Sequence, residues 1–515
     1  MAYLLGIDIG TTGARALLVS EKGVVVAGAT EEYPLYTPEP MWAEQDPLDW
    51  WRATLDAVRR VLGTPGVKPD EIKGIGLTGQ MHGVVLLDEK NEVLRPSLIW
   101  CDQRSQAQCD WITERVGAER LIELTCNPAL TGFSAPKLLW VRDHEPAIFE
   151  QAKKFLLPKD YIRFKLTGEF ASEVSDASGT SLFDVRQRKW SDEVLHDLEL
   201  DRSLLPDVYE SVVVSGRVSR ETARLLGLPE NTPVVGGGGD QAAGAVGNGV
   251  VEPGIVSSTI GSSGVVFAFT EQPRLDPKGR MQSFCHAVPG KWHVMGVTQG
   301  AGLSLRWFRD QCGGAEILVG SYAGVDPYEL LIKEAARAEP GCEGLLFLPY
   351  LMGERAPHLD PNAKGVFFGL TGRHIRAHMI RAIMEGVAFS LRDSLEIIQQ
   401  EMEIPVTQVR ASGGGARSEL WRQIQADIFG TEIVTINSSE GPAYGAALLA
   451  AVGAGFYDTV EDACRNAIRI VERVEPLADN VALYADYYGI YRDLYPALKS
   501  SFDRVTEIVT QRKSW

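Results

Sequence analysis

Near its N-terminus the chain alternates between apolar runs and turn signals in an order that predicts a β-β-β-α-β unit. Apolar residues dominate positions 3–10 and 14–19, and the intervening Gly10-Thr11-Thr12-Gly13 predicts a hairpin turn. A third apolar run predicts another strand. A capping signal at Asp46 then precedes apolar residues at helical spacing, and residues 72–77 form the last apolar run.

The same hairpin pattern returns far along the chain. Ile9-Gly10-Thr11-Thr12-Gly13 matches Ile260-Gly261-Ser262-Ser263-Gly264 position by position, and apolar runs flank both copies. A repeat over such a distance predicts two related lobes, each presenting one hairpin rich in glycine and hydroxyl groups. Glycines let successive N–H groups point to one place, which suits phosphate oxygens. For either copy alone, a plain hairpin turn remains the alternative.

A third glycine cluster, Ser412-Gly413-Gly414-Gly415-Ala416, lies between an apolar run and an amphipathic helical pattern. A strand–glycine–helix junction suits a nucleotide, because the positive end of the helix dipole favours phosphate. The spacing fails the dinucleotide fingerprint at Ser418, and the chain contains neither a Gly-Lys-Ser/Thr P-loop nor the protein-kinase catalytic loop. The phosphates are therefore expected to be held in some other way.

Two aspartates stand beside these glycine motifs. Asp8 precedes the first hairpin, whereas Thr259 occupies the matching position in the second copy, which suggests one acid for Mg²⁺ or its water shell. An Asp8 bonded to its own turn is the alternative. Asp240 follows four glycines and precedes a helix of small residues, so a substrate could approach its carboxylate closely. A helix N-cap is the alternative for Asp240, and both roles are compatible.

Two polar loops are candidates for contact with a ligand. Gly79-Gln80-Met81-His82-Gly83 follows a predicted strand, and the strand ends of open α/β sheets are where ligands bind. A structural loop histidine beside a packed Met81 is the alternative. Trp100 could stack on a sugar with Asp102 and its neighbours as hydroxyl partners, but a core tryptophan ahead of a capped helix fits the pattern better.

Composition narrows the class of protein. The 515 residues predict two to four domains, at the usual roughly 100 to 200 residues per domain. The chain carries 51 Lys and Arg against 68 Asp and Glu, a formal charge of -17, so the basic footprint of nucleic-acid or anionic-membrane binding is lacking. The seven cysteines are scattered without a Cys-x-x-Cys pair, which argues against a zinc cluster and a disulfide scaffold. No secretory signal pattern opens the sequence, so we expect a cytoplasmic enzyme.

Together these motifs resemble those of the FGGY carbohydrate kinases. The resemblance rests on Asp8-Ile9-Gly10-Thr11-Thr12 with Arg15, the Gly-Gly-Gly-Asp at 237–240 and the Gly-Gly-Gly-Ala at 413–416. Two longer segments, residues 134–141 and residues 365–385, are similar to the family's two signatures. Residues 79–83, 157–161 and 175–180 resemble segments of those members that phosphorylate xylulose. The similarity extends to about residue 455.

The resemblance implies an α/β protein with two actin-like (ribonuclease H-like) ATPase lobes and a cleft between them. It assigns residues 1–252 to an N-terminal lobe, which binds the sugar and carries the first phosphate hairpin, and residues 253–455 to a nucleotide-binding lobe. Residues 456–515, with tyrosines at helical spacing, are expected to form a helical tail that packs on a lobe. A homodimer contact through the tail is the alternative.

The resemblance also implies roles for the motif residues. Asp240 is the base that accepts the proton of the sugar's C5 hydroxyl. Met81 and His82 contact the sugar, with Gln80 and Gln241 as further candidates, and Asp8 holds Mg²⁺ through water, so that the cofactor is Mg²⁺ with ATP. The expected ATP contacts are Gly10, Thr11, Thr12, Arg15, Gly261, Ser262, Gly302, Gly413, Gly414 and Gly415.

The activity implied is ATP-dependent phosphorylation of D-xylulose to D-xylulose 5-phosphate, with ATP and a small sugar as partners. Gln241 is Asn in some relatives, which leaves the preference among sugar hydroxyls open. A kinase of the same family acting on another ketose, polyol or aldonate remains an alternative. So does an actin-like switch ATPase, in which Asp240 and the Gln-Met-His loop have no evident use. A dinucleotide oxidoreductase is supported only by the glycine clusters.

Overall fold

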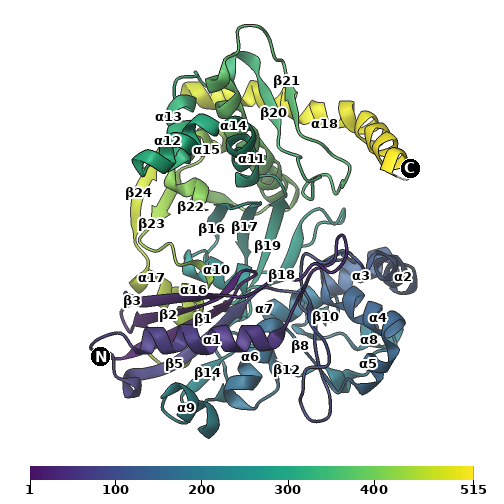
Figure 1. The fold of residues 1–515 in the computed structure, drawn as a ribbon, viewed down its shortest axis with the longest axis vertical. Coiled ribbons are helices and arrows are strands. Elements are labelled where there is room, and N and C mark those ends of the chain that lie inside the picture. The colour runs from purple at the N-terminus through teal and green to yellow at the C-terminus, as the bar shows by residue number, and fades with distance from the viewer. Residues whose placement is uncertain (514–515) are drawn as a thin grey trace. The chain divides into compact units, whose positions relative to one another are not determined.

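The computed structural model describes residues 1–513 and forms two compact units, each discontinuous in sequence. Unit 1 comprises Met1–Glu252, Phe269–His293 and Glu440–Arg469; unit 2 comprises Pro253–Ala268, Val294–Ser439 and Ile470–Trp515. Each unit is built around one mixed β-sheet with helices packed on it (Figure 1), which confirms the expected α/β class. The linear boundaries 1–252, 253–455 and 456–515 stay a prediction, and the last two residues of the tail lie outside the described residues.

The sheet of unit 1 has the expected β-β-β-α-β beginning. Its strand order is β13-β14-β5-β1-β2-β3, with the short β15 beside β5. The hairpin strands β1 and β2 are antiparallel, whereas β5, β14 and β15 run parallel to β1. The strands are β1 (Tyr3–Ile9), β2 (Gly13–Ser20), β3 (Val25–Glu32), β5 (Ile72–Gly79), β13 (Val214–Arg217), β14 (Pro233–Val235) and β15 (Gly238–Gly239).

Helices cover both faces of this sheet. On one face lies α1 (Pro47–Leu62) (Figure 1). It packs Trp50 against the odd-numbered side chains of β1, and the Asp46 carboxylate caps the helix by accepting from the Leu48 N–H. On the other face lies α16 (Gly441–Gly453). The remaining helices around the sheet are α6 (Pro158–Thr167), α9 (Arg220–Leu226), α10 (Asp240–Gly247) and α17 (Val460–Ala467).

The contact between α16 and the sheet depends on glycine. A Cβ on Gly6 of β1 would lie 2.0 Å from the Ala443 carbonyl oxygen, and one on Gly76 of β5 would lie 1.9 Å from that of Ala446. Both distances are far inside van der Waals contact, so only glycine lets the helix backbone approach this closely. This approach brings the N-terminal end of α16 toward the edge of the sheet where β1 and β5 end.

A second apolar cluster of unit 1 is formed by short elements, most of which follow β5 in sequence. Its helices are α2 (Gln106–Val116), α3 (Ala118–Thr125), α4 (Ser134–His144), α5 (Pro146–Gln151), α7 (Val174–Ala177) and α8 (Asp192–Asp197). Its strands and those beside it are β4 (Glu44–Gln45), β6 (Val85–Leu87), β7 (Ser97–Leu98), β8 (Lys154–Leu156), β9 (Ala171–Glu173), β10 (Phe183–Asp184), β11 (Lys189–Trp190), β12 (Asp207–Tyr209) and β18 (Gln282–Cys285).

The sheet of unit 2 repeats the plan of the first. The order β19-β17-β16-β22-β23-β24 matches β3-β2-β1-β5-β14-β13: a hairpin, then parallel neighbours, then an antiparallel edge strand. The predicted duplication is therefore present in the topology as well as in the loops. The strands of this order are β16 (Gly254–Ile260), β17 (Gly264–Thr270), β19 (Trp292–Thr298), β22 (Val406–Gly413), β23 (Ile433–Ile436) and β24 (Ile470–Val474). A separate two-stranded sheet pairs β20 (Leu346–Leu348) with β21 (Val366–Phe368).

The long last helix, α18 (Ala478–Lys513), lies against α14 (Arg376–Glu396) through its tyrosines. The Tyr484 hydroxyl donates to the Glu385 carboxylate at 2.6 Å, and the Tyr488 hydroxyl donates to Asp393 at 2.8 Å. The other helices of unit 2 are α11 (Gly302–Cys312), α12 (Gly314–Ala323), α13 (Pro327–Ala335) and α15 (Glu419–Phe429). Within residues 1–513, none of the helices combines the length and apolar character needed to cross a membrane.

The close approach of α16 gives a test of the fold. We expect Gly76→Ala to lower the free energy of unfolding by at least about 2 kcal/mol, because the new methyl group overpacks the contact with the Ala446 carbonyl. Urea unfolding followed by circular dichroism measures the change. Gly314→Ala is the matched control, since a Cβ there meets nothing within 4 Å. Equal stability of both variants would contradict the packing described.

Candidate functional site

The register of the unit 1 sheet brings three predicted motifs to one edge. Gly238 of β15 pairs with Thr78 of β5, Thr78 pairs with Asp8 of β1, and Asp8 pairs with Arg15 of β2. Since β15, β5 and β1 run parallel, the residues that follow their ends leave the sheet at the same edge. The first phosphate hairpin, the Gln-Met-His loop and Asp240 therefore start side by side.

Asp8 and Asp240 interact electrostatically at this edge. Desolvation raises the pKa of Asp8 to about 7, with a further upward contribution from the Asp240 charge and an opposing one from Arg15. Desolvation also raises the pKa of Asp240 to about 6, against hydrogen bonds from the Gln241 backbone and side chain. Gly239 takes the N-cap position and Asp240 is the first residue of α10, so the N-cap alternative for Asp240 is wrong. Two carboxylates withdrawn from water and close to each other favour a cation or a proton between them.

The first hairpin is closed by the Gly10 N–H, which donates to the Gly13 carbonyl at 3.1 Å. The Arg15 guanidinium donates to Thr30 Oγ1 at 3.0 Å and pairs with the Glu440 carboxylate, which immediately precedes α16. Thr12 is exposed at the turn. Glu440 was not found from the sequence, because it lies 425 positions from Arg15 and belongs to no motif.

The Gln-Met-His loop is attached to the hairpin through its backbone and through Gln45. The Gln80 N–H donates to the Ile9 carbonyl at 2.8 Å, and Gln80 Nε2 donates to Gln45 Oε1 at 2.8 Å. Gln45 Nε2 in turn donates to the Thr11 carbonyl at 2.7 Å. The fully buried Gln45 thus links the predicted sugar loop to the predicted phosphate hairpin, although sequence patterns gave no reason to select it.

Met81 and His82 lie beside the backbone that leads to Asp240 and beside Gly179, which lies in the turn that follows α7. A Cβ on Gly239 would lie 2.9 Å from Met81 Cγ, so Met81 packs directly against the residue before Asp240. His82 Nδ1 is 2.7 Å from the Gly179 carbonyl oxygen, and its ring stacks on Phe133 with 4.5 Å between centroids. The three residues of this loop and Asp240 are therefore in one neighbourhood.

Trp100 is neither a core residue nor remote from the hairpin. It is 39 % exposed, and its indole N–H donates to Thr11 Oγ1 at 2.9 Å.

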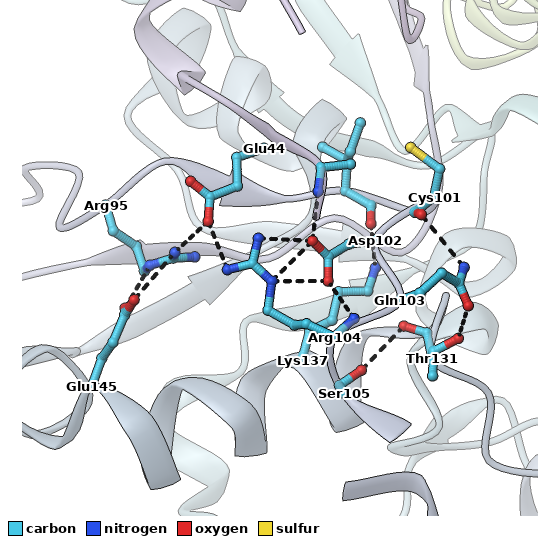
Figure 2. Close-up of polar contacts among 12 residues, drawn as sticks. Glu44, Arg95, Cys101, Asp102, Gln103, Arg104, Ser105, Thr131, Lys137 and Glu145 are labelled. Carbon is cyan, nitrogen blue, oxygen red and sulfur yellow. Dashed lines mark hydrogen bonds and ion pairs between the residues drawn. The ribbon is translucent and has the colours of Figure 1, made fainter. Parts of the chain in front are cut away.

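The buried Asp102, the other residue of this segment considered as a ligand contact, accepts from the Ala43 N–H and from the Arg104 guanidinium. The guanidinium carbon of Arg104 lies 3.6 Å from the centroid of the Trp42 ring. Figure 2 shows Asp102 enclosed by Arg104 and Lys137, so Asp102 anchors the loop and does not face a ligand.

Buried polar groups hold the glycine-rich segment, residues 235–239, that precedes Asp240. Arg163 donates to the carbonyls of Val235 and Gly236 at 2.7 and 2.6 Å. The Gly239 N–H donates to Ser175 Oγ at 3.0 Å, and Ser175 Oγ donates to the Glu173 carboxylate at 2.7 Å. These bonds satisfy the backbone of a glycine-rich turn that would otherwise be flexible. Asp240 is thus held by a rigid support.

In unit 2 the predicted nucleotide glycines also gather at one sheet edge. The parallel register of β16 and β22 pairs Ile260 with Gly413, so Gly261 and Gly414 leave the sheet together. The Gly302 N–H at the start of α11 donates to the Gly261 carbonyl at 2.8 Å, and a Cβ on Gly302 would lie 2.4 Å from that oxygen. Ser262 is exposed at the turn. Within unit 2, Gly261, Ser262, Gly302 and residues 413–415 therefore form one group.

The residues at the unit 1 edge fit a Mg²⁺ ion carried with a nucleotide. Among the described residues Asp8 Oδ1 is buried without a hydrogen-bond partner, and carboxylate oxygen is a preferred ligand of Mg²⁺. Within residues 1–513, no group of three or more His, Cys, Asp or Glu side chains is arranged to hold a metal ion by itself. Phosphate oxygens and water would have to complete the coordination, as is usual for Mg²⁺.

Comparison with known proteins extends over both units. Residues 3–247 match the N-terminal domain of the FGGY family of carbohydrate kinases, and residues 256–454 match its C-terminal domain. The chain is 38% identical to a xylulose kinase of Bacillus subtilis, over 97% of this chain and 98% of the relative. It is 44% identical to a xylulose kinase of Escherichia coli, over 87% and 90%. A gluconokinase of Bacillus subtilis is 34% identical, over 98% of both chains.

A solved structure agrees in fold. The crystal structure of a xylulose kinase from Brucella ovis superposes with a TM-score of 0.89 at 36% identity, covering 97% of this chain and 99% of that one. The expectation of an actin-like ATPase fold is confirmed by this match, together with the repeated strand order of the two units.

Proposed function

The chain belongs to the FGGY family of carbohydrate kinases, and on that premise we propose that it transfers the terminal phosphoryl group of ATP to the C5 hydroxyl of D-xylulose. The observation that carries the proposal is the meeting of Asp8, Asp240 and the Gln-Met-His loop at one sheet edge. Carboxylate, imidazole and amide groups together suit a polyhydroxyl substrate. The xylulose kinases among the relatives support this sugar, and the gluconokinase makes an aldonate the second candidate.

In this proposal Asp240 orients the sugar and accepts its proton. The carboxylate accepts a hydrogen bond from the C5 hydroxyl and takes the proton as the new O–P bond forms and the bond to ADP breaks. Because the transition state of phosphoryl transfer is loose, positioning counts for more than basicity. A pKa of about 6 keeps Asp240 ionised at neutral pH and makes it more basic than an ordinary aspartate.

The phosphate chain is assigned to the first hairpin. Gly10 would let the phosphates approach the turn closely, and the backbone N–H groups of Thr11 and Thr12 and the fork of Arg15 would contact the terminal phosphates. The Glu440 carboxylate pairs with the Arg15 guanidinium and holds it in place. A bound phosphate would pair with the same guanidinium, either together with Glu440 or in its place. The positive ends of the α10 and α16 dipoles add to the attraction for anions.

The remaining nucleotide contacts are assigned to unit 2. Gly261 and Ser262 would bind phosphate oxygens, and Gly302 with Gly413, Gly414 and Gly415 would take the nucleoside end. Gly413 has φ +76°, a conformation that few other residues adopt, so its turn depends on glycine. Mg²⁺, held through water by Asp8, would neutralise charge that develops on the phosphates. Met81, His82, Gln80 and Gln241 would contact the sugar.

The first prediction concerns the substrate. In a coupled assay of ADP release with Mg-ATP, we expect turnover to depend strongly on D-xylulose in a panel of D-xylulose, L-ribulose, D-ribulose, L-xylulose, gluconate, glycerol and no sugar. Preference for another panel member would contradict the sugar assignment and leave the kinase class intact. ATP turnover that is independent of every sugar would contradict the proposed transfer and favour a switch ATPase.

The second prediction concerns the base. We expect Asp240→Asn to lower kcat by about a hundred- to ten-thousand-fold, because the amide can neither accept the proton nor hold the hydroxyl in line as an anion. Steady-state kinetics at saturating Mg-ATP measures the change. Asp393→Asn is a matched control. Asp393 is also buried, with a pKa raised to about 7, but its carboxylate accepts a hydrogen bond from the Tyr488 hydroxyl in unit 2. Near-normal kcat in Asp240→Asn would overturn the role.

The third prediction concerns pH. Asp240 must be ionised to accept a proton, so kcat/KM for the sugar should fall as pH drops below the pKa of the site. We expect the acidic limb between about pH 6 and 7, where Asp240 and Asp8 titrate, and not near pH 4. Tryptophan fluorescence over the same range checks that the protein stays folded. A profile that is flat down to about pH 5 would exclude this pair as the titrating groups.

A further inference from the structure

His82, the proposed sugar contact, has a backbone conformation that requires support from its surroundings. Its φ is +71°, in the left-handed region that residues other than glycine seldom occupy. Such a conformation is strained and persists only where neighbouring groups enforce it. The groups that enforce it here determine where the imidazole points.

The first turn of α4 supplies this support. Lys137 Nζ donates to the His82 carbonyl oxygen at 2.9 Å, and Ser134 Oγ donates to the same oxygen at 3.1 Å. Ser134 and Lys137 are three positions apart, so their side chains lie on one face of the helix. Phe133, which precedes the helix, stacks on the His82 ring. Three neighbouring residues thus hold both the backbone and the ring of His82.

Lys137 also fixes a second segment. Its ammonium donates to the Ile99 carbonyl oxygen at 3.0 Å (Figure 2), and the next residue, Trp100, donates to Thr11 of the hairpin. Lys137 is fully buried, and burial lowers its pKa to about 7 against the favourable charge of Asp102. A buried lysine is costly unless its donors are used, and here two of them hold loop carbonyls.

On the other side of the ring, Gly179 sets the tautomer of His82. A carbonyl oxygen can only accept, so Nδ1 carries the hydrogen in its 2.7 Å contact with Gly179. In the neutral ring Nε2 is then the acceptor, which suits a sugar hydroxyl. A Cβ on Gly179 would lie 2.5 Å from His82 Cε1, so this side of the ring is closely packed as well.

We propose that Lys137 is a positioning residue for sugar binding, which acts by holding the His82 carbonyl so that the imidazole faces the sugar. This inference rests on the proposed function, since it takes His82 as a sugar contact. Ser134 assists through the same carbonyl. Lys137 itself touches no substrate in this proposal.

The test is a double-mutant cycle read as the KM for D-xylulose. We expect Lys137→Met to raise this KM about ten- to a hundredfold, because a His82 imidazole that is displaced from the sugar loses most of its contribution to binding. His82→Ala should raise it by a similar factor, and the double variant should be no worse than His82→Ala alone. Lys73→Met is the matched control, since the Lys73 ammonium also donates to a carbonyl, that of Asp70, but on the surface.

The outcomes separate this inference from the proposed function. If His82→Ala raises the sugar KM but Lys137→Met leaves it unchanged, or if the two effects multiply, Lys137 does not act through His82 and the inference is overturned. If no variant alters a sugar-dependent rate because none exists, the proposed function itself fails and the inference with it.

A milder variant guards against misfolding of Lys137→Met. Ser134→Ala removes only one hydroxyl donor to the His82 carbonyl. We expect a smaller increase in the sugar KM, again absent in the His82→Ala background, with circular dichroism unchanged. An unchanged KM in Ser134→Ala, or an increase that persists in the His82→Ala background, would overturn the proposal that Ser134 and Lys137 act through the His82 carbonyl.

Discussion

The parallel register of β1, β5 and β15 places the candidate site of unit 1, because it makes three loops leave the sheet at one edge. Gly238, Thr78 and Asp8 lie opposite one another across these strands. The glycine contacts with α16 fix the same strands from the other direction. A slip of one residue in β1 would turn Asp8 to the opposite face of the sheet and put Ile7 or Ile9 in its place. The chemistry of the site therefore depends on strand pairing before it depends on any side chain.

Buried charged side chains in unit 1 differ in how fully they are paired. Away from the sheet edge, buried charges have close partners: Lys159 Nζ is 2.6 Å from Asp160 Oδ1, and Arg163 donates to loop carbonyls. At the edge, Asp8 and Asp240 keep raised pKa values that lie near neutral pH. Withdrawing such groups from water without a full set of partners costs stability. A site of this kind favours a bound cation, proton or hydroxyl group, which is how a preorganised active site gains its affinity.

Sequence patterns predicted the parts of this arrangement that are local. The two hairpins, the capped helix at Asp46 and the strand–glycine–helix junction at Ser412 depend on neighbouring residues and could be recognised one by one. Glu440 and Gln45 could not, since each acts on a segment far away in the sequence and neither belongs to a turn or strand pattern. Lys137 lies in the signature segment 134–141, but nothing in that segment indicates that it acts on His82, 55 positions away. The discontinuity of the two units has the same origin: residues 440–469 join unit 1 through contacts such as Gly6 with Ala443.

The repeated sheets also differ at the position that separates their chemistry. Asp8 and Thr259 occupy the same place in the two hairpins. Thr259 Oγ1 lies 2.7 Å from Ser412 Oγ, so this neutral hydroxyl pair is satisfied inside unit 2. Asp8 keeps a buried oxygen without a hydrogen-bond partner among the described residues. The duplicated hairpin thus has one copy preceded by a buried acid, which suits a cation, and one copy preceded by a neutral hydroxyl whose hydrogen bond is made inside unit 2. The asymmetry follows from a single side chain, because the backbone plan of both hairpins is shared.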